Sequence, residues 1–445
     1  MYRWVGNKPQ LYTFFVCKHK GAEKMIKKNV DVKQEILAGL TSFFAISYVI
    51  IVNSMILAEA GIPPELSVFG TILISVIGCL AIGLIGKVPI VITTGMGVNS
   101  FFTYTLVYSL KLTWQAALAA SFCASLIYLI VAYTPLATIL IEAVPDSLKH
   151  GITAGIGIFL VIVGLENGGI IVRGDHTFMT LNSFQSPILL LTLGSLIVTL
   201  FLLLRNIQGS FFIGIILTTI VANLFKIVPP TESLFSLAEI KNYPSIVGQL
   251  DFSSVFSTEF VLGTFSLAMI LIFESMGLFN GLLPNLKEQE YKKAFRINGI
   301  IMLLSSLLGT SPTIPAAESS TGIQQGGKTG LTAVTVGGLF FAAIFAIPLL
   351  SYIPSSALSP VIIITGCLMM SNMQHIDLSD LSEWFPAFLM IVIMAFSMSI
   401  SDGLAFGFVA YPLVKTFANQ GKMITKPMWV ISLLFLLYLV AKIWI

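Results

Sequence analysis

The residues from Gly309 to Lys328 read GTSPTIPAAESSTGIQQGGK, a polar and interrupted stretch between two apolar segments. Pro312 and Pro315 prevent a regular helix from beginning before about Ala316, because proline lacks a backbone N–H and its ring blocks the preceding turn. A further membrane span is expected at this place in the chain, yet irregular backbone at membrane depth is tolerated only against protein or a water-filled cavity. The stretch therefore predicts a broken helix that lines a substrate site.

Glu318 lies inside this stretch and is expected in the first turn of a half-helix that opens at Ala316. The helix dipole favours a negative charge at that place. A carboxylate at membrane depth costs roughly 2.5–3.5 kcal/mol on insertion scales, so it is a functional candidate. Glu274, in the apolar run Ile272–Gly277, is a second candidate for the same reason, although pairing with a lysine or with hydroxyl groups would explain it as structural.

The composition identifies an integral membrane protein. The chain has 445 residues, of which 56% are hydrophobic and only 10% are charged, and its mean hydropathy is +0.93. A soluble domain carries about 25% charged residues. The net charge of +3 gives no indication of nucleic acid as a partner. The four cysteines are far apart and the four histidines are expected in tails or loops, so no metal site, cofactor or catalytic dyad is predicted.

Apolar segments of spanning length recur along the whole chain. About seven precede a polar stretch and seven follow it, and an odd number per half predicts two halves of opposite orientation, the plan of secondary transporters. We therefore expect an all-α integral membrane protein with about 14 transmembrane segments in two inverted seven-span repeats. The segments fall at 36–58, 67–86, 89–110, 114–134, 151–171, 188–204 and 210–228, then at 259–283, 295–309, 313–326, 330–350, 355–371, 385–400 and 403–418.

Lysine and arginine are enriched in alternate loops, which predicts a cytoplasmic N-terminus. The protein is expected to be a multi-pass protein of the plasma membrane. Translation from Met1 or from Met25 is equally compatible with the sequence. The expected organisation is a cytoplasmic tail at 1–34, a first repeat at 35–228, an extracytoplasmic loop at 229–258, a second repeat at 259–418 and a C-terminal apolar segment at 419–445.

The third span of the first half is interrupted like its counterpart at Gly309–Lys328. Residues Val88–Phe102 form an extended, β-branched run that meets glycines and then restarts as a helix. Interrupted segments in corresponding positions of two halves indicate a binding site near the midplane. We expect short extended strands in spans 3 and 10, with half-helix N-termini that offer backbone N–H groups to a ligand.

Other polar residues in or near the spans can be explained by a structural role as well as by a functional one. Asn53 and Asn99 either contact a ligand or bond to an adjacent helix. Asp402 is better explained as the cap of a helix beginning at Gly403. Glu166 and Asn167 are better explained as a helix end at the glycines that follow than as a gate.

Residues Gly322–Thr329 match the P-loop pattern G-x-x-x-x-G-K-T. A P-loop follows a strand and opens a helix in an α/β nucleotide-binding domain. Here the pattern joins two membrane spans, and the glycines are explained by the end of one half-helix and the start of the next span. ATP binding is therefore rejected.

The sequence resembles the nucleobase–cation symporter superfamily, in its AzgA-like branch of adenine, guanine and hypoxanthine permeases. The matching stretches run in family order from about residue 30 to 418. They are EILAGLTSF at Glu35–Phe43, GMGVNSFF at Gly95–Phe102, Gly155–Ile170, Glu318–Thr332 and DGLAFGF at Asp402–Phe408.

The resemblance implies a core domain of spans 1–4 and 8–11 and a gate domain of spans 5–7 and 12–14, through which relatives form homodimers. It also implies that Glu274 on the eighth span and Glu318 on the tenth hold the base, with backbone around Gly95, Thr313 and Ala316 completing the site. The branch usually shows V-D-x-F-D-T on the eighth span, where this chain has Leu271, Glu274 and Ser275. This departure leaves the preferred base open.

Together these observations predict a proton-coupled importer of purine bases embedded in the lipid bilayer, and not an enzyme. Carboxylates accept ring N–H donors well, and Asn99 is placed to contact the base. Phe101 and Phe273 are candidates to stack on it. Glu318 is expected to contact the base, and Glu274 to carry the coupled H⁺. A carrier of pyrimidines, xanthine or anions on the same fold is the alternative.

Overall fold

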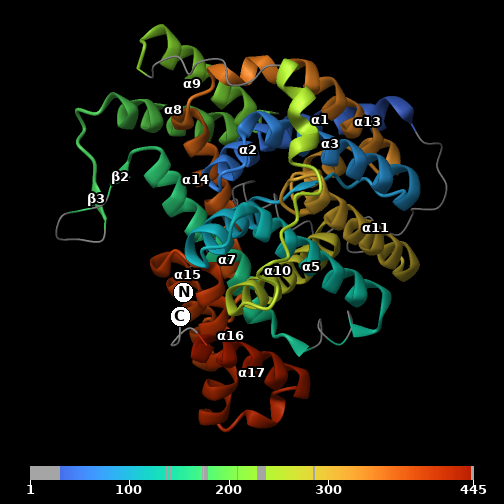
Figure 1. Cartoon of the computed structure of the whole chain (residues 1–445), viewed down its shortest axis with the longest axis vertical. Coiled ribbons are helices and arrows are strands. Elements are labelled where there is room, and N and C mark those ends of the chain that lie inside the picture. The colour runs from blue at the N-terminus through green and yellow to red at the C-terminus, as the bar shows by residue number, and fades with distance from the viewer. Residues whose placement is uncertain are drawn as a thin grey trace, which may run out of the picture.

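The computed structural model describes residues 31–441 apart from 137–138, 140–142, 173, 175–178, 208, 228–236 and 284–285. Residues 1–30 of the expected tail and 229–236 of the expected loop therefore lie outside the described residues. Helices dominate the fold (Figure 1). Several begin with a side chain that accepts backbone N–H groups of the first turn, which satisfies donors that the helix itself leaves unpaired; these capping residues are Asp31, Thr113, Ser257, Thr329, Asp380 and Ser399.

The first part of the chain contains three short strands, β1 to β3, and the helices around them. Its elements are α1 (Val32–Ile46), α2 (Val49–Glu59), α3 (Pro64–Ala81), the π-helix η3 (Ile82–Gly86), β1 (Ile92–Thr94), α4 (Met96–Ser100), the π-helix η4 (Phe101–Ser109), α5 (Trp114–Tyr133), α7 (Asp146–Asn167), β2 (Ile171–Val172), β3 (Thr180–Leu181), α8 (Pro187–Leu204), α9 (Ser210–Leu224) and the 3-10 helix η5 (Leu237–Ser245).

The second part consists of helices and one short strand. Its elements are α10 (Thr258–Leu282), α11 (Glu288–Leu307), β4 (Thr313–Pro315), α12 (Ser319–Gln324), α13 (Gly330–Ala343), the 3-10 helix η6 (Ile344–Tyr352), α14 (Ser355–Met370), the 3-10 helix η7 (Ser371–His375), α15 (Leu381–Ser397), α16 (Ile400–Phe417), the 3-10 helix η8 (Gly421–Met423) and α17 (Lys426–Ala441). Figure 1 shows α16 and α17 at one end of the long axis.

The lengths and apolar composition of the helices are those of a multi-pass membrane protein. Among the described residues, eight helical segments are long and apolar enough to cross a membrane, and shorter apolar helices accompany them. The mostly helical membrane fold predicted from composition is therefore confirmed, and the finer number of spans stays a prediction. The eight segments are Val32–Glu59, Pro64–Gly86, Trp114–Tyr133, Asp146–Asn167, Pro187–Leu204, Thr258–Leu282, Gly330–Pro348 and Ser356–His375.

The two interrupted segments meet each other in the middle of the fold. Strands β1 and β4 pair in antiparallel fashion, with Ile92 opposite Pro315 and Thr94 opposite Thr313. The contact continues past the strands, because the Ala316 N–H donates to the Val91 carbonyl at 2.8 Å. Backbone groups that neither half could satisfy alone inside a membrane are thus satisfied between the halves.

The helices pack in two groups. We call α1, α2, α3, α5, α10, α11 and α13 the α13 group, because α1 and α3 pack on α13 while α5 packs on α10 and α11 and α2 packs on α3. We call α7, α8, α9, α14, α15 and α16 the α14 group, because α7, α8 and α9 pack on α14 while α15 joins α7 to α16. Strands β1 and β4 belong with the α13 group through their contacts with α3, α10 and α11.

Two expectations about helix starts are wrong. Glu318 is not in the first turn of a half-helix that opens at Ala316, because α12 begins at Ser319 and Glu318 is the residue before it. Asp402 does not cap a helix, because α16 begins earlier, at Ile400, and Ser399 is its capping residue. Asp402 instead accepts a hydrogen bond from the Tyr438 hydroxyl at 2.6 Å.

The P-loop-like stretch has an intramolecular explanation. Buried Glu35 accepts hydrogen bonds from the backbone N–H groups of Lys328 and Thr329 at 3.0 and 3.1 Å and from the Thr332 hydroxyl at 2.5 Å. A carboxylate of the chain itself therefore lies where a nucleotide phosphate would be bound at the start of α13. The contact joins α1 to α13.

Replacing this carboxylate should destabilise the α13 group. Glu35→Ala leaves two backbone N–H groups and a hydroxyl without an acceptor, at a cost of about 1–3 kcal/mol for unsatisfied buried groups. We expect a lower midpoint of thermal unfolding for the detergent-purified variant. Glu290→Ala is the matched control, because Glu290 is exposed in the first turn of α11. Equal midpoints for the two variants would contradict the assigned role of Glu35.

Candidate functional site

A cavity of about 1000 Å³ lies beside the paired strands. It reaches from the ends of β1 and β4 to the first turn of α7 and to η7. Its walls include the break between α1 and α2, the later turns of α10 and the residues before α12. Five of the residues predicted from sequence line it, namely Gly95, Phe273, Glu274, Ala316 and Glu318.

Glu318 is oriented by a tyrosine from the opposite half of the chain. The Tyr48 hydroxyl donates a hydrogen bond to Glu318 Oε1 at 2.5 Å. Tyr48 lies in the turn between α1 and α2, and its ring is 1% exposed. A hydrogen bond to a charged acceptor is stronger than one between neutral groups. Glu318 therefore has one engaged oxygen and one that remains available in the cavity.

Glu274 has a different environment. It lies in the second half of α10, and its Oε2 is buried with no hydrogen-bond partner among the described residues. Gly97 faces this carboxylate, since a Cβ added at Gly97 would lie 3.5 Å from Glu274 Oε2 and 3.0 Å from Ile156 Cγ2. The glycine leaves room around the acid. A buried polar atom without a partner needs an explanation, such as a water, an ion, a proton or a ligand.

Gly95 allows the close approach of the two strands. It directly follows β1, and a Cβ at this position would lie 2.3 Å from Ile314 Cδ1. Such a contact is too short for any real side chain, so a larger residue would displace Ile314. Ala316, after β4, is also small and lines the same wall. Small residues therefore keep the strand ends open to the cavity.

Asn99 and Thr313 lie behind this wall rather than in it. The Ser311 hydroxyl bonds to Asn99 Oδ1 at 2.6 Å and lies 3.2 Å from Asn53 Oδ1. Asn53 in turn donates to Thr71 Oγ1 at 2.7 Å. Both asparagines thus hydrogen-bond to adjacent segments, which is the structural interpretation and not the ligand-binding one. Thr313 Oγ1 is buried without a partner among the residues described.

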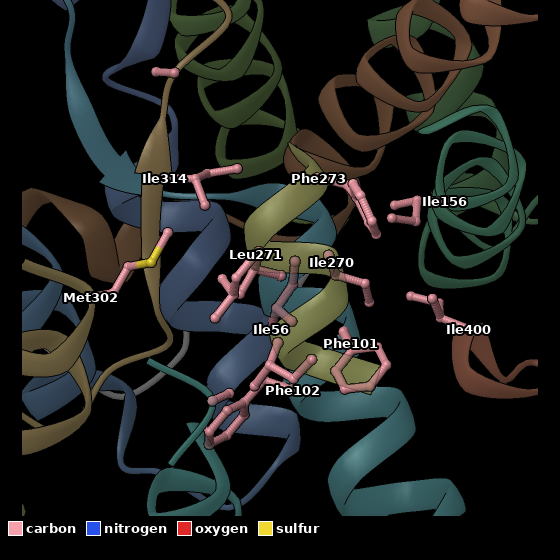
Figure 2. Close-up of a cluster of buried hydrophobic side chains, with 14 of the residues drawn as sticks. Ile56, Phe101, Phe102, Ile156, Ile270, Leu271, Phe273, Met302, Ile314 and Ile400 are labelled. Atoms are coloured by element: carbon pink, nitrogen blue, oxygen red, sulfur yellow. The ribbon is translucent and has the colours of Figure 1, made fainter. Parts of the chain in front are cut away.

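The two phenylalanines are placed differently. Phe273 lines the cavity, and Figure 2 shows it on α10 pointing toward Ile156 of α7. Phe101 is fully buried in an apolar cluster with Ile56, Ile270 and Phe102 (Figure 2). Only Phe273 of this pair is in position to contact a cavity ligand.

The cavity has a polar mouth that sequence reasoning missed. The Lys149 ammonium pairs with Asp146 at 2.9 Å at the start of α7. The His150 ring packs against the His375 ring with centroids 5.0 Å apart. His150 is therefore in a helix and not in a loop, contrary to expectation. Asp146, Lys149 and His150 are neighbours in α7, whereas His375 is distant in sequence and lies in η7, so no local pattern indicates the contact of the two histidine rings.

The far end of α7 makes a hydrogen-bonded contact between the two helix groups. Asn167 Nδ2 donates to Glu59 Oε1 at 3.2 Å, and the Tyr104 hydroxyl donates to Glu59 Oε2 at 2.9 Å. Glu59 ends α2 in the α13 group, whereas Asn167 ends α7 in the α14 group. Because α7 runs from the cavity mouth to this contact, the two lie at opposite ends of the helix.

Comparison with known proteins gives relatives that cover most of the chain. Nucleobase transporter PlAzg2 of Paenibacillus larvae is 39% identical over 385 residues, covering 86% of this chain and 77% of its own length. Guanine/hypoxanthine permease PbuO of Bacillus subtilis is 35% identical, with 93% and 98% covered. Adenine permease AdeP of Escherichia coli is 30% identical, with 94% and 95% covered.

Solved structures share the fold at low sequence identity. The transmembrane domain of the bicarbonate transporter BicA from a cyanobacterium superposes with a TM-score of 0.61 at 15% identity, over 86% of this chain and 98% of that domain. The murine anion transporter Slc26a9 in its inward-facing state gives a TM-score of 0.64 at 12% identity, over 94% and 77%.

The family assignment rests on the whole chain and not on one motif. A sequence model described as the Permease family matches residues 33–406. This range contains both strands, both carboxylates and every element from α1 into α16. The resemblance seen in the sequence is confirmed, and the chain belongs to the Permease family of membrane transporters.

Proposed function

We propose that this chain is a secondary transporter that imports purine nucleobases by proton symport. The observation that carries the proposal is the pair of carboxylates, Glu274 and Glu318, that line one cavity beside the paired strands. A purine presents ring N–H donors, which carboxylate oxygens accept well, and a flat face for which Phe273 is a partner. The names of the relatives, which specify nucleobase, guanine/hypoxanthine and adenine transport, support this substrate class.

The two carboxylates divide the work between base and proton. Glu318 accepts a hydrogen bond from Tyr48, which stabilises its ionised form as an acceptor for the base. Glu274 Oε2 is buried without a donor among the described residues. An ionised carboxylate without a partner is unfavourable in such a place. We therefore assign the coupled proton to Glu274 and the direct base contact to Glu318.

An anion as the transported substrate is disfavoured by the charges of the cavity. Among its described lining residues, Lys149 alone is a lysine or arginine, and it lies at the mouth in an ion pair with Asp146. Two carboxylates near the strand ends would repel an anion. The likeness to anion transporters concerns the fold alone.

We further propose about 14 spans in two inverted repeats, with the N-terminus in the cytoplasm and the protein in the plasma membrane. In this scheme the α13 group is the core domain and the α14 group is the gate domain of a homodimer. The cavity mouth, near Lys149, is then cytoplasmic, which makes this an inward-open state. The contact of Asn167 with Glu59 closes the outer side, and movement of one group against the other would break it.

Uptake of radiolabelled adenine, guanine and hypoxanthine tests the function directly. The chain is expressed in a bacterial strain that lacks its own purine permeases, with and without a protonophore. We expect at least one base to accumulate, and the protonophore to abolish that accumulation, because the proton gradient drives it. With protein verified in the membrane, absence of uptake of all three bases would overturn the proposal.

Glu318→Gln should reduce uptake to the background of empty cells. The amide removes the negative charge and keeps only one acceptor oxygen, so its NH2 group faces either the Tyr48 hydroxyl or the base in place of an acceptor. Glu290→Gln, at an exposed position of α11, serves as the control and should transport like the wild type. Uptake by Glu318→Gln at the wild-type rate, at equal membrane abundance, would remove Glu318 from the site.

Glu274→Gln should uncouple transport from the proton. The amide resembles the protonated acid, so the variant is expected to equilibrate the base across the membrane without concentrating it. The measurement is the ratio of internal to external base at steady state, which should fall to about one and lose its sensitivity to the protonophore. Undiminished uphill accumulation by this variant would assign the proton to another group.

A further inference from the structure

Tyr48 is a buried polar side chain that the proposed division of labour between Glu274 and Glu318 leaves without a part in substrate choice. It comes from the turn between α1 and α2, 270 positions before its hydrogen-bond partner Glu318. Its ring packs edge-on against Phe211 of α9, with centroids 5.2 Å apart at 70°. Tyr48 therefore contacts the α13 group and the α14 group at once.

The position of the hydroxyl is determined by its surroundings. Tyr48 is 1% exposed, and Phe211 is 7% exposed. A ring packed in this way cannot swing away from the carboxylate without opening a void or displacing its neighbours. The hydroxyl is thus held 2.5 Å from Glu318 Oε1 before any ligand enters the cavity, so the carboxylate is oriented in advance.

The hydrogen bond changes what Glu318 offers to a ligand. An ionised carboxylate with both oxygens free accepts two adjacent N–H groups in parallel. With Oε1 already engaged by Tyr48, Oε2 is the oxygen left for the cavity. A ligand edge with one N–H is then fully matched by Oε2, whereas a second adjacent N–H must share Oε1 with the Tyr48 hydroxyl, which weakens that hydrogen bond.

We propose that Tyr48 is a positioning residue that sets substrate specificity, by holding Glu318 so that only one of its two oxygens is offered to the base unshared. This inference rests on the proposed purine transport. Purines that differ only by a 2-amino group differ in this feature, because guanine has N–H groups at positions 1 and 2 and hypoxanthine has one at position 1. Tyr48 thereby reduces the advantage of guanine over hypoxanthine.

The test compares these two bases as competitors. Their inhibition constants are measured against uptake of whichever labelled purine the wild type accumulates. In Tyr48→Phe the ring remains and Oε1 is no longer shared with a hydroxyl, so guanine gains a second unshared acceptor and hypoxanthine gains none. We expect the ratio of the hypoxanthine constant to the guanine constant to rise about tenfold, the effect of one hydrogen bond to a charged acceptor. Tyr48→Met, which also lacks the hydroxyl, should shift the ratio in the same direction.

The control is Tyr243→Phe, which also removes a tyrosine hydroxyl, here one that donates to the Leu308 carbonyl at 2.7 Å outside the cavity lining. It should leave the ratio unchanged, even where it lowers the maximal rate. An unchanged ratio in both Tyr48 variants, or an equal shift in Tyr243→Phe, would overturn the specificity role. These results differ from a failure of the proposed function, in which the wild type itself would accumulate no purine.

Discussion

The pairing of β1 with β4 is the interaction on which the rest of the structure depends. Backbone N–H and C=O groups inside a bilayer have no water to bond with, so a break in a spanning helix requires partners from elsewhere in the protein. Here each interrupted segment supplies them to the other, from Ile92–Thr94 to Thr313–Pro315 and onward through Val91 and Ala316. The same pairing brings the two halves of the chain to one place and aligns the segments that follow the strands beside one cavity.

This arrangement gives the two carboxylates of the site different surroundings. The strand ends are lined by small residues, and Gly95 tolerates the approach of Ile314 only because it has no side chain. Behind the strand ends, the Ser311 hydroxyl hydrogen-bonds to Asn53 of α2 and Asn99 of α4 and so joins the segments that precede β4 and follow β1. The two carboxylates then differ through their neighbours, since Glu318 receives a hydroxyl donor and Glu274 Oε2 receives none among the described residues. In the proposed mechanism this difference separates base recognition from proton binding.

Two contacts between the helix groups relate the site to the proposed movement of one group against the other. Tyr48 touches Phe211 of the α14 group near the carboxylates, and Glu59 meets Asn167 at the opposite end of α7. A packed interface of this kind has discrete arrangements and does not deform continuously. In the proposed cycle, opening the outer side breaks the Glu59 contact and displaces Phe211 from Tyr48. Substrate recognition by Glu318 and the position of the gate would then be linked through one tyrosine.

Hydropathy, proline, glycine and charge act locally, so the amino-acid sequence alone indicated the membrane class, the interrupted segments and the two carboxylates within the spans. It also pointed to Gly95, Phe273 and Ala316, which line the cavity. The three-dimensional packing was needed to see that Asn99 bonds to Ser311, that Phe101 packs in an apolar cluster and that Glu35 holds the start of α13. The partnership of Tyr48 with Glu318 was equally invisible, because it joins residues 270 positions apart. Such contacts arise from how helices pack, and no local pattern of residues encodes them.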